Sequence, residues 1–178
     1  GIMKFDSALK QAQKAQVALE TVRTTIGSAK TIALQEVAKV ETKFNFSKIP
    51  DKVLAAIKDP KVYGVEITNP IGGKSSGQIK QTVGNLDKIR AAAGELLTPK
   101  NWQEAPKTEM RQIKQFYGEL AGHIKATAKQ AGKDISKQYD DYSKFMDNYR
   151  LVQHTIQNSQ GVAMGNKLKS AFKFMSEQ

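Results

Sequence analysis

The stretch VEITNPIGGKSSGQIK, residues 65–80, contains the Gly-Lys-Ser arrangement of a phosphate-binding loop. A Walker loop has the pattern G-x-x-x-x-G-K-[ST], in which glycines let the backbone amides curl around phosphates. Aligning Gly73-Lys74-Ser75 with this pattern puts Thr68 where the first glycine must be. No apolar strand ending in Asp follows to hold magnesium. We therefore interpret the stretch as an exposed loop tip in which Gly and Pro form turns.

The other residue types that could do chemistry do not form a recognisable set. His123 and His154 lie far apart in the sequence, and neither belongs to an H-E-x-x-H motif. Asp140 and Asp141 are adjacent, so on a helix they point about 100° apart and do not form an acid–base pair. The absence of cysteine excludes disulfides, zinc–thiolate sites and cysteine nucleophiles. The sequence therefore predicts a non-enzymatic protein without a catalytic centre, metal or cofactor.

Composition and charge describe a basic chain of modest hydrophobicity. Lys and Arg outnumber Asp and Glu by 28 to 17, which gives a net charge of +11. Apolar residues make up 39% and aromatic residues 7% of the sequence, which suits elongated helices with much surface. No apolar run approaches the roughly 20 residues that cross a bilayer, so we expect no transmembrane segment. The positive charge indicates either solubility or attraction to polyanions.

The spacing of apolar residues predicts helices over most of the chain. Apolar or small residues recur every three or four positions at the start and predict a long helix over residues 5–44. All five prolines fall between residues 45 and 106, where they predict a small appendage of short pieces. These pieces are a helix at 51–58, an extended segment at 61–68, a loop at 69–76, a helix at 77–97 and a connection that buries Trp102.

The period resumes after the appendage and predicts a second long helix over residues 107–157, interrupted near Gly132. A short helix at 162–176 closes the chain. We therefore expect an all-α fold, a single elongated domain over residues 1–178. It would be a bundle of two to three long helices with a small, mostly helical appendage inserted between them. Within the second helix, Gly118 and Gly122 predict close approach to a neighbouring helix, with Ala121 and Ala126 helping.

Four lysines in the second long helix are spaced by four: Lys125, Lys129, Lys133 and Lys137. On one helix they would rise in steps of about 6 Å, close to a phosphate repeat. This ridge could follow a polyanion, or it could be an ordinary solvated face. No aromatic residues alternate with the lysines to stack on bases, which disfavours a single-stranded nucleic acid.

Residues 1–16, GIMKFDSALKQAQKAQ, resemble the mature start of the minor pilins of type IV secretion systems, the pilus-tip components of conjugation machines. Members of this family commonly begin Gly-Ile-Pro-x-x-Asp after signal cleavage, and a Gln- and Ala-rich long helix follows. Gly1, Ile2 and Asp6 match, Phe5 precedes the Asp as it often does, and Met3 replaces the proline. The family is also built as a long-helix bundle with a small helical appendage between the long helices.

The resemblance implies a non-enzymatic protein that is periplasmic or extracellular after signal removal and is incorporated at the tip of a conjugative pilus. Its partners would be other secretion-system and pilus proteins, and it would contact a recipient or host cell surface. The family brings no catalytic set to this sequence. Because binding residues concentrate on loops, the candidate contact residues lie in the appendage. They are Tyr63, Ile67, Ile71 and Lys74.

Two other classes stay open. One is a cytoplasmic helical protein, starting at Met3, that binds nucleic acid or another polyanion through Lys125, Lys129, Lys133 and Lys137. Strongly salt-dependent binding would support it. The other is a secreted or membrane-active protein that uses the C-terminal KLKSAFKFM segment, in which apolar residues and lysines alternate. Liposome binding that is lost on deletion of residues 167–178 would support that class.

Overall fold

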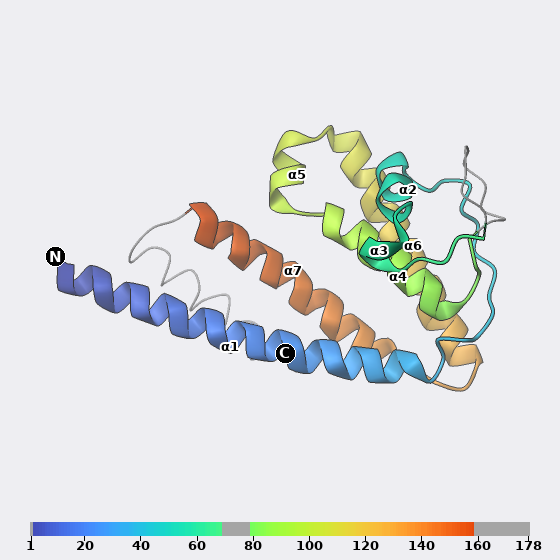
Figure 1. Cartoon of the computed structure of the whole chain (residues 1–178), viewed down its shortest axis with the longest axis horizontal. Helices are drawn as coiled ribbons and strands as arrows, with labels where there is room; N and C mark the ends of the chain where they lie inside the picture. Colours follow the sequence, from blue (N-terminus) through green and yellow to red (C-terminus); the bar gives the residue numbers. More distant parts are fainter. Residues whose placement is uncertain (1, 69–78, 159–178) are drawn as a thin grey trace. The chain divides into compact units, whose positions relative to one another are not determined.

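The computed structural model describes residues 2–68 and 79–158. Within these residues the structure contains seven helices, and extended pairing is limited to two isolated antiparallel bridges. The all-α fold expected from the sequence is therefore confirmed. The expected loop at 69–76 and the expected helix at 162–176 lie outside the described residues. The helices are α1 (Ile2–Gln35), α2 (Asp51–Ile57), α3 (Pro60–Tyr63), α4 (Val83–Leu96), α5 (Pro99–Glu104), α6 (Lys107–Gln130) and α7 (Ser136–Asn158) (Figure 1).

The chain divides into two compact units. The α1/α7 unit contains the residues up to 31 and those from 137 onward, and the central unit contains residues 32–136. Each unit has its own buried apolar residues. The single elongated domain expected from the sequence stays a prediction.

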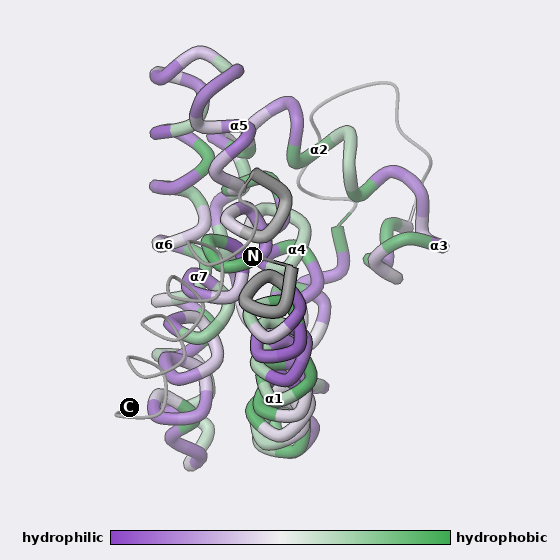
Figure 2. Tube along the Cα trace, turned by 90° about the vertical axis from the view of Figure 1, so that its left-hand side faces the viewer, coloured by the Kyte–Doolittle hydropathy of each residue, from purple (hydrophilic) through white to green (hydrophobic). Residues whose placement is uncertain are grey.

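In the α1/α7 unit, the two long helices pack through a buried apolar cluster. Ala12, Leu19, Phe145 and Val152 form a buried cluster, each 4% exposed or less. Val22, Ile26, Tyr142 and Tyr149 pack against it from the side. Hydrophobic and hydrophilic residues alternate along α1 instead of forming one long apolar run (Figure 2). Among the described helices, none has the length and apolar character that a membrane crossing requires.

The first long helix ends at Gln35, not at residue 44 as the spacing of apolar residues predicts. Beyond it, the backbone pairs with the segment before α4 in place of continuing the helix. The amides of Thr42, Val83 and Gly84 donate to the carbonyl oxygens of Gln81, Val40 and Ala38, at 3.1, 3.0 and 2.9 Å. Gly84 suits this close approach, because an added Cβ would lie 3.1 Å from the Ala38 carbonyl oxygen, a tight contact.

The second long helix is broken near Gly132, as expected. α6 ends at Gln130 and α7 begins at Ser136. Gly132 has a φ of 95°, a left-handed conformation that favours glycine, and the amides of residues 131–133 donate back to carbonyls of the last turn of α6. Asp134 Oδ1 accepts from the Ser136 amide at 2.9 Å, which fixes the entry into α7.

The appendage differs from its prediction at three places. Residues 60–63 form the short helix α3 where an extended segment was expected, because Asp59 caps it and Pro60 occupies its first turn. The helix predicted at 77–97 begins only at Val83, after a cap by Thr82. Trp102 was expected in a buried connection, but it lies in α5 and is half-buried. The short helix predicted at 51–58 is present as α2.

The core of the central unit lies chiefly between α4 and α6. Its central side chains are aliphatic and fully buried, and burial of each stabilises the fold by about 1.5–3 kcal/mol. Those at 0% exposure include Leu86, Ile89, Ile113, Leu120 and Ile124. Packing α4 on α6 in this way holds the N-terminal end of α4, and with it the appendage segments around residues 64–68 and 79–82.

Candidate functional site

The candidate site is the set of polar contacts that joins the chain on either side of residues 69–78. We call it the loop base. Ile67 and Ile79 form an antiparallel bridge across it, and the Lys80 amide donates to the Glu66 carbonyl oxygen at 3.1 Å. The other members come from the end of α3 and from α4. The loop base consists of Gly64, Glu66, Ile67, Ile79, Lys80, Asn85 and Lys88.

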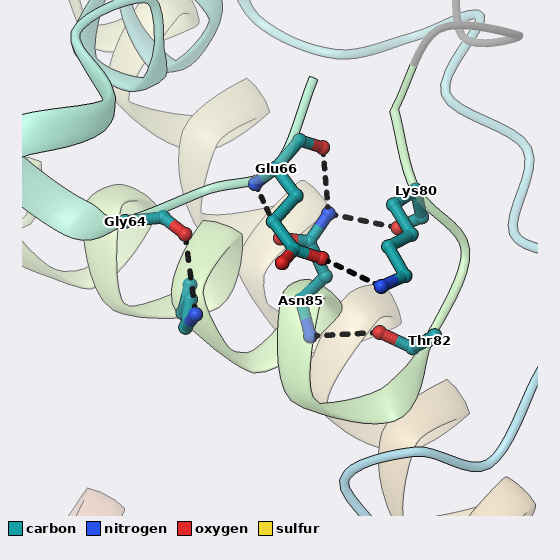
Figure 3. Close-up of polar contacts among 6 residues, drawn as sticks. Gly64, Glu66, Lys80, Thr82 and Asn85 are labelled. Atoms are coloured by element: carbon teal, nitrogen blue, oxygen red, sulfur yellow. Dashed lines mark hydrogen bonds and ion pairs between the residues drawn. The ribbon is translucent and has the colours of Figure 1, made fainter. Parts of the chain in front are cut away.

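Asn85 is the centre of the loop base and is only 3% exposed. Its Oδ1 accepts from the Glu66 amide at 2.7 Å, and its Nδ2 donates to the carbonyl oxygens of Glu66 and Lys80 at 3.1 and 2.8 Å (Figure 3). The Asn85 amide in turn donates to Thr82 Oγ1 at 3.3 Å, the cap of α4. A single buried side chain therefore binds both chain segments to the first turn of α4.

Charged side chains reinforce the loop base at its surface. Lys80 Nζ lies 3.0 Å from Glu66 Oε2, with both side chains more than half exposed. The hydrogen bond and positive charge of Lys80 hold the pKa of Glu66 below its usual value. Lys88 Nζ donates to the Gly64 carbonyl oxygen at 3.1 Å, at a residue whose φ is 69° (Figure 3). An exposed ion pair adds little stability by itself, so Asn85 carries most of the constraint.

Tyr63 lies at the end of α3 and is half-buried. Its hydroxyl donates a hydrogen bond to Glu95 Oε2 on α4. Burial, followed by the hydrogen bond and negative charge of Glu95, raises the pKa of Tyr63 to about 12. The hydroxyl therefore stays neutral at physiological pH and holds α3 against α4.

The structure brings two of the four predicted contact residues to one place. Tyr63 lies beside the loop base, and Ile67 is half-buried within it. Ile71 and Lys74 lie outside the described residues. Hydrogen bonds and ion pairs join the members of the loop base to one another, an arrangement suited to a structural role. Among the residues that the structure describes, no group of three His, Asp or Glu side chains could hold a metal ion.

The lysine ridge does not lie on one helix, which corrects the expectation from its spacing. Lys125 and Lys129 are on α6, Lys133 is in the connection after it, and Lys137 is on α7 in the other unit. Lys133 Nζ is 3.0 Å from Glu36 Oε2, and Lys137 Nζ is 3.0 Å from Asp141 Oδ2. The turn at Gly132 interrupts the four-residue spacing, so the ridge is not a straight track for phosphates.

The two glycines of α6 also differ from their prediction. Within the described part of the chain, an added Cβ at Gly118 or Gly122 would meet no other element within 4 Å, so neither glycine makes a close contact with a described neighbouring element. Both are exposed in the middle of a 24-residue helix. A glycine at such a position costs about 0.5–1 kcal/mol relative to alanine. The helix therefore carries two unfavourable residues that the internal packing of the central unit does not require.

A shallow cavity of about 380 Å³ lies between residues 47–51 and one side of α6. Its walls combine an aromatic ring, Phe116, with amides and charges of both signs. Such a mixed lining has no convergent set of polar groups of the kind that orients a small ligand. We assign it no ligand. The other lining residues are Ser47, Lys48, Ile49, Pro50, Asp51, Gln112, Gln115 and Glu119.

His123 is the titratable residue that connects α6 to the segment after α1. Its Nε2 lies 2.6 Å from Thr42 Oγ1, which is also 3.1 Å from Thr127 Oγ1. The ring packs edge-to-face with Phe44, with centroids 5.3 Å apart. Partial burial lowers the pKa of His123 below its usual value of 6.5, because it penalises the charged imidazolium.

This lowered pKa predicts that the protein is less stable in mild acid. The unfolded chain binds a proton near pH 6.5, whereas the folded chain binds it only at lower pH, so stability falls as pH drops through this interval. We expect the free energy of unfolding to decrease from pH 7 to pH 5 by more in the wild type than in His123→Gln, measured by urea unfolding. An equal decrease in both proteins would contradict this assignment.

Sequence reasoning missed the buried polar residues of α4. Asn85, Asp87 and Arg90 are 3%, 7% and 2% exposed. Polar residues in a helix are normally assigned to its solvent face. The sequence signal near Asn85 was Thr82, three residues earlier, because threonine is a residue type that caps the start of a helix. No sequence signal showed that α4 would be covered on its polar side as well.

In comparisons with known proteins, no family model, no curated protein and no solved structure matches the chain.

Proposed function

We propose that this protein is a non-enzymatic structural and adhesive component of a type IV secretion pilus, and that its appendage makes the contact. The observation that carries the proposal is the loop base. Asn85 and the Ile67–Ile79 bridge hold residues 66–67 and 79–80 against α4, while Glu66, Thr68 and Lys80 beside them are exposed. Chain segments that are already held in position lose less conformational entropy on binding than unconstrained ones, which favours a contact made beside the loop base.

Two features of the whole chain support the same proposal. The first is the likeness of Gly1, Ile2, Phe5 and Asp6 to the mature start of minor pilins. The second is the order of elements, in which long helices precede and follow a set of short ones. In this proposal the protein is exported to the periplasm and joins the pilus through other secretion-system proteins. The loop segment then contacts a recipient or host cell surface.

The proposal is tested in a donor strain that carries the native gene. Deletion should abolish or strongly reduce conjugative transfer, and the protein should be recovered with pili sheared from the wild-type cell surface. A protein that stays in the cytoplasm, in a strain whose transfer survives the deletion, would overturn the pilus assignment.

The contact role of the appendage needs variants that leave assembly intact. We expect Ile71→Asp combined with Lys74→Glu to reach the sheared pilus fraction normally but to reduce transfer at least tenfold. The matched control is Lys10→Glu combined with Lys14→Glu on α1, where both side chains are exposed and belong to the other unit. Equal transfer by both double variants would show that the appendage makes no essential contact.

A further inference from the structure

The solvent-facing side of α6 carries five cations and two glycines in one row. We call this row the cationic face of α6. Its members follow each other at intervals of three or four residues, which keeps them on one side of a helix. None of them is acidic, and all but Lys125, which is half-buried, are exposed. The cationic face consists of Lys107, Arg111, Lys114, Gly118, Gly122, Lys125 and Lys129.

The cationic face has two glycines at its centre and a group of cations at each end. Lys107, Arg111 and Lys114 occupy the first turns of α6, and Lys125 and Lys129 occupy the last. The two groups are about 16 Å apart along the axis, counted from residue 114 to residue 125. Between them the glycines leave the helix backbone uncovered by any other described element, because none of the residues at 2–68 and 79–158 outside this helix lies within 4 Å of either Cβ position. Lys107 Nζ also contacts Trp102, donating to its carbonyl oxygen at 2.6 Å.

We propose that the cationic face of α6 is a docking surface for an acidic α-helix of a partner protein. Charge complementarity indicates that the partner is acidic, because five cations and no acidic residue line the row. The two glycines at the centre of the row indicate that the partner surface is a helix. The distance between two packed helices depends on the side chains at their contact, so glycine at two successive turns lets another helix approach closely. Acidic side chains on the partner's outer turns then reach the two cationic groups.

Two other anionic partners fit the row less well. A nucleic acid strand presents phosphates at every step, whereas the centre of this row, where contact is closest, has no cation. Only one of the five cations is Arg, the residue that binds phosphate bidentately. A membrane surface is normally bound by large apolar side chains next to the basic ones. No large apolar residue belongs to this row.

The test uses the purified full-length chain and a synthetic helical peptide in which glutamates at both ends flank an alanine-rich centre. Binding is measured by fluorescence anisotropy. We expect Gly118→Leu combined with Gly122→Leu to weaken binding at least tenfold, because leucine fills the space that the partner helix needs. The open space at both positions accommodates leucine within the folded chain, so thermal stability should be retained or raised. Loss of binding without loss of stability separates docking from misfolding.

Charge variants test the two ends of the row. Lys125→Gln combined with Lys129→Gln should also weaken peptide binding about tenfold, whereas Lys10→Gln combined with Lys14→Gln, with the same change of charge on α1, should not. Double-stranded DNA is the competing probe. The proposal is overturned if DNA binds and the peptide does not, if the glycine variant binds the peptide as the wild type does, or if the α1 control loses as much binding as the α6 variant.

Discussion

Asp87→Ala should lower the free energy of unfolding by about 3–5 kcal/mol, the largest effect that we expect of any single substitution. Arg90 Nε donates to Asp87 Oδ1 at 2.9 Å, and the two side chains are only 3% and 10% exposed. Arg90 Nη1 also donates to the Tyr117 hydroxyl at 3.3 Å, and its guanidinium lies 5.7 Å from that ring's centroid. Removing the carboxylate takes the negative charge of Asp87 away from a buried guanidinium.

The measurement is urea unfolding followed by circular dichroism, with a matched exposed pair as control. Lys137 and Asp141 form an i,i+4 ion pair at 3.0 Å, but their side chains are 84% and 41% exposed. Asp141→Ala should therefore cost no more than about 0.5 kcal/mol. Replacing both buried partners, as Asp87→Leu with Arg90→Met, should recover most of the stability that Asp87→Ala loses. Equal losses at Asp87 and Asp141 would show that the buried pair has no special role.

The second large effect is expected at Asn85. Asn85→Ala removes one acceptor and two donor interactions from the backbone of Glu66 and Lys80. The backbone groups left unsatisfied near the core should lower the free energy of unfolding by about 2–3 kcal/mol. Amide hydrogen exchange should speed up at Glu66 and Lys80, because the antiparallel pairing between them depends on the same side chain.

The control for Asn85 is Asn148 on α7. Its Nδ2 makes one exposed hydrogen bond to the Lys144 carbonyl oxygen at 3.0 Å, so Asn148→Ala should change stability by no more than about 0.5 kcal/mol. If Asn85→Ala behaves like Asn148→Ala and the amide of Glu66 exchanges at its wild-type rate, the loop base does not depend on Asn85. The proposed function would then lose the loop base as its structural support.

The loop base and the cationic face of α6 assign different tasks to the central unit. The loop base joins residues 66–67 to residues 79–80 and Asn85, and the proposed cell-surface contact is placed beside it. The cationic face offers a long side of one helix, as assembly with a helical partner requires. The variants that test the two proposals change different parts of the chain. Ile71 and Lys74 belong to the segment between α3 and α4, whereas Gly118 and Gly122 lie on α6.

The helical class, the existence of the long helices and the break near Gly132 could all be predicted from the amino-acid sequence. These properties are local. Apolar residues at intervals of three and four produce the buried stripe of α1, and a glycine suits the φ of 95° in the turn after α6. The proline-rich appendage and the helix at residues 51–57 were likewise visible in neighbouring residues.

The end of α1, the start of α4 and the burial of polar residues depend on contacts between distant segments. Residues 38–42 have a helical pattern, but their backbone groups bond to residues 81–84, about forty positions away. Asn85, Asp87 and Arg90 have the composition of a solvent face, yet neighbouring segments cover them. Conversely, Gly118 and Gly122 have the spacing of a packed contact, yet no other element that the structure describes lies within 4 Å of their Cβ positions. Periodicity describes one element at a time, whereas burial depends on which distant segments reach it.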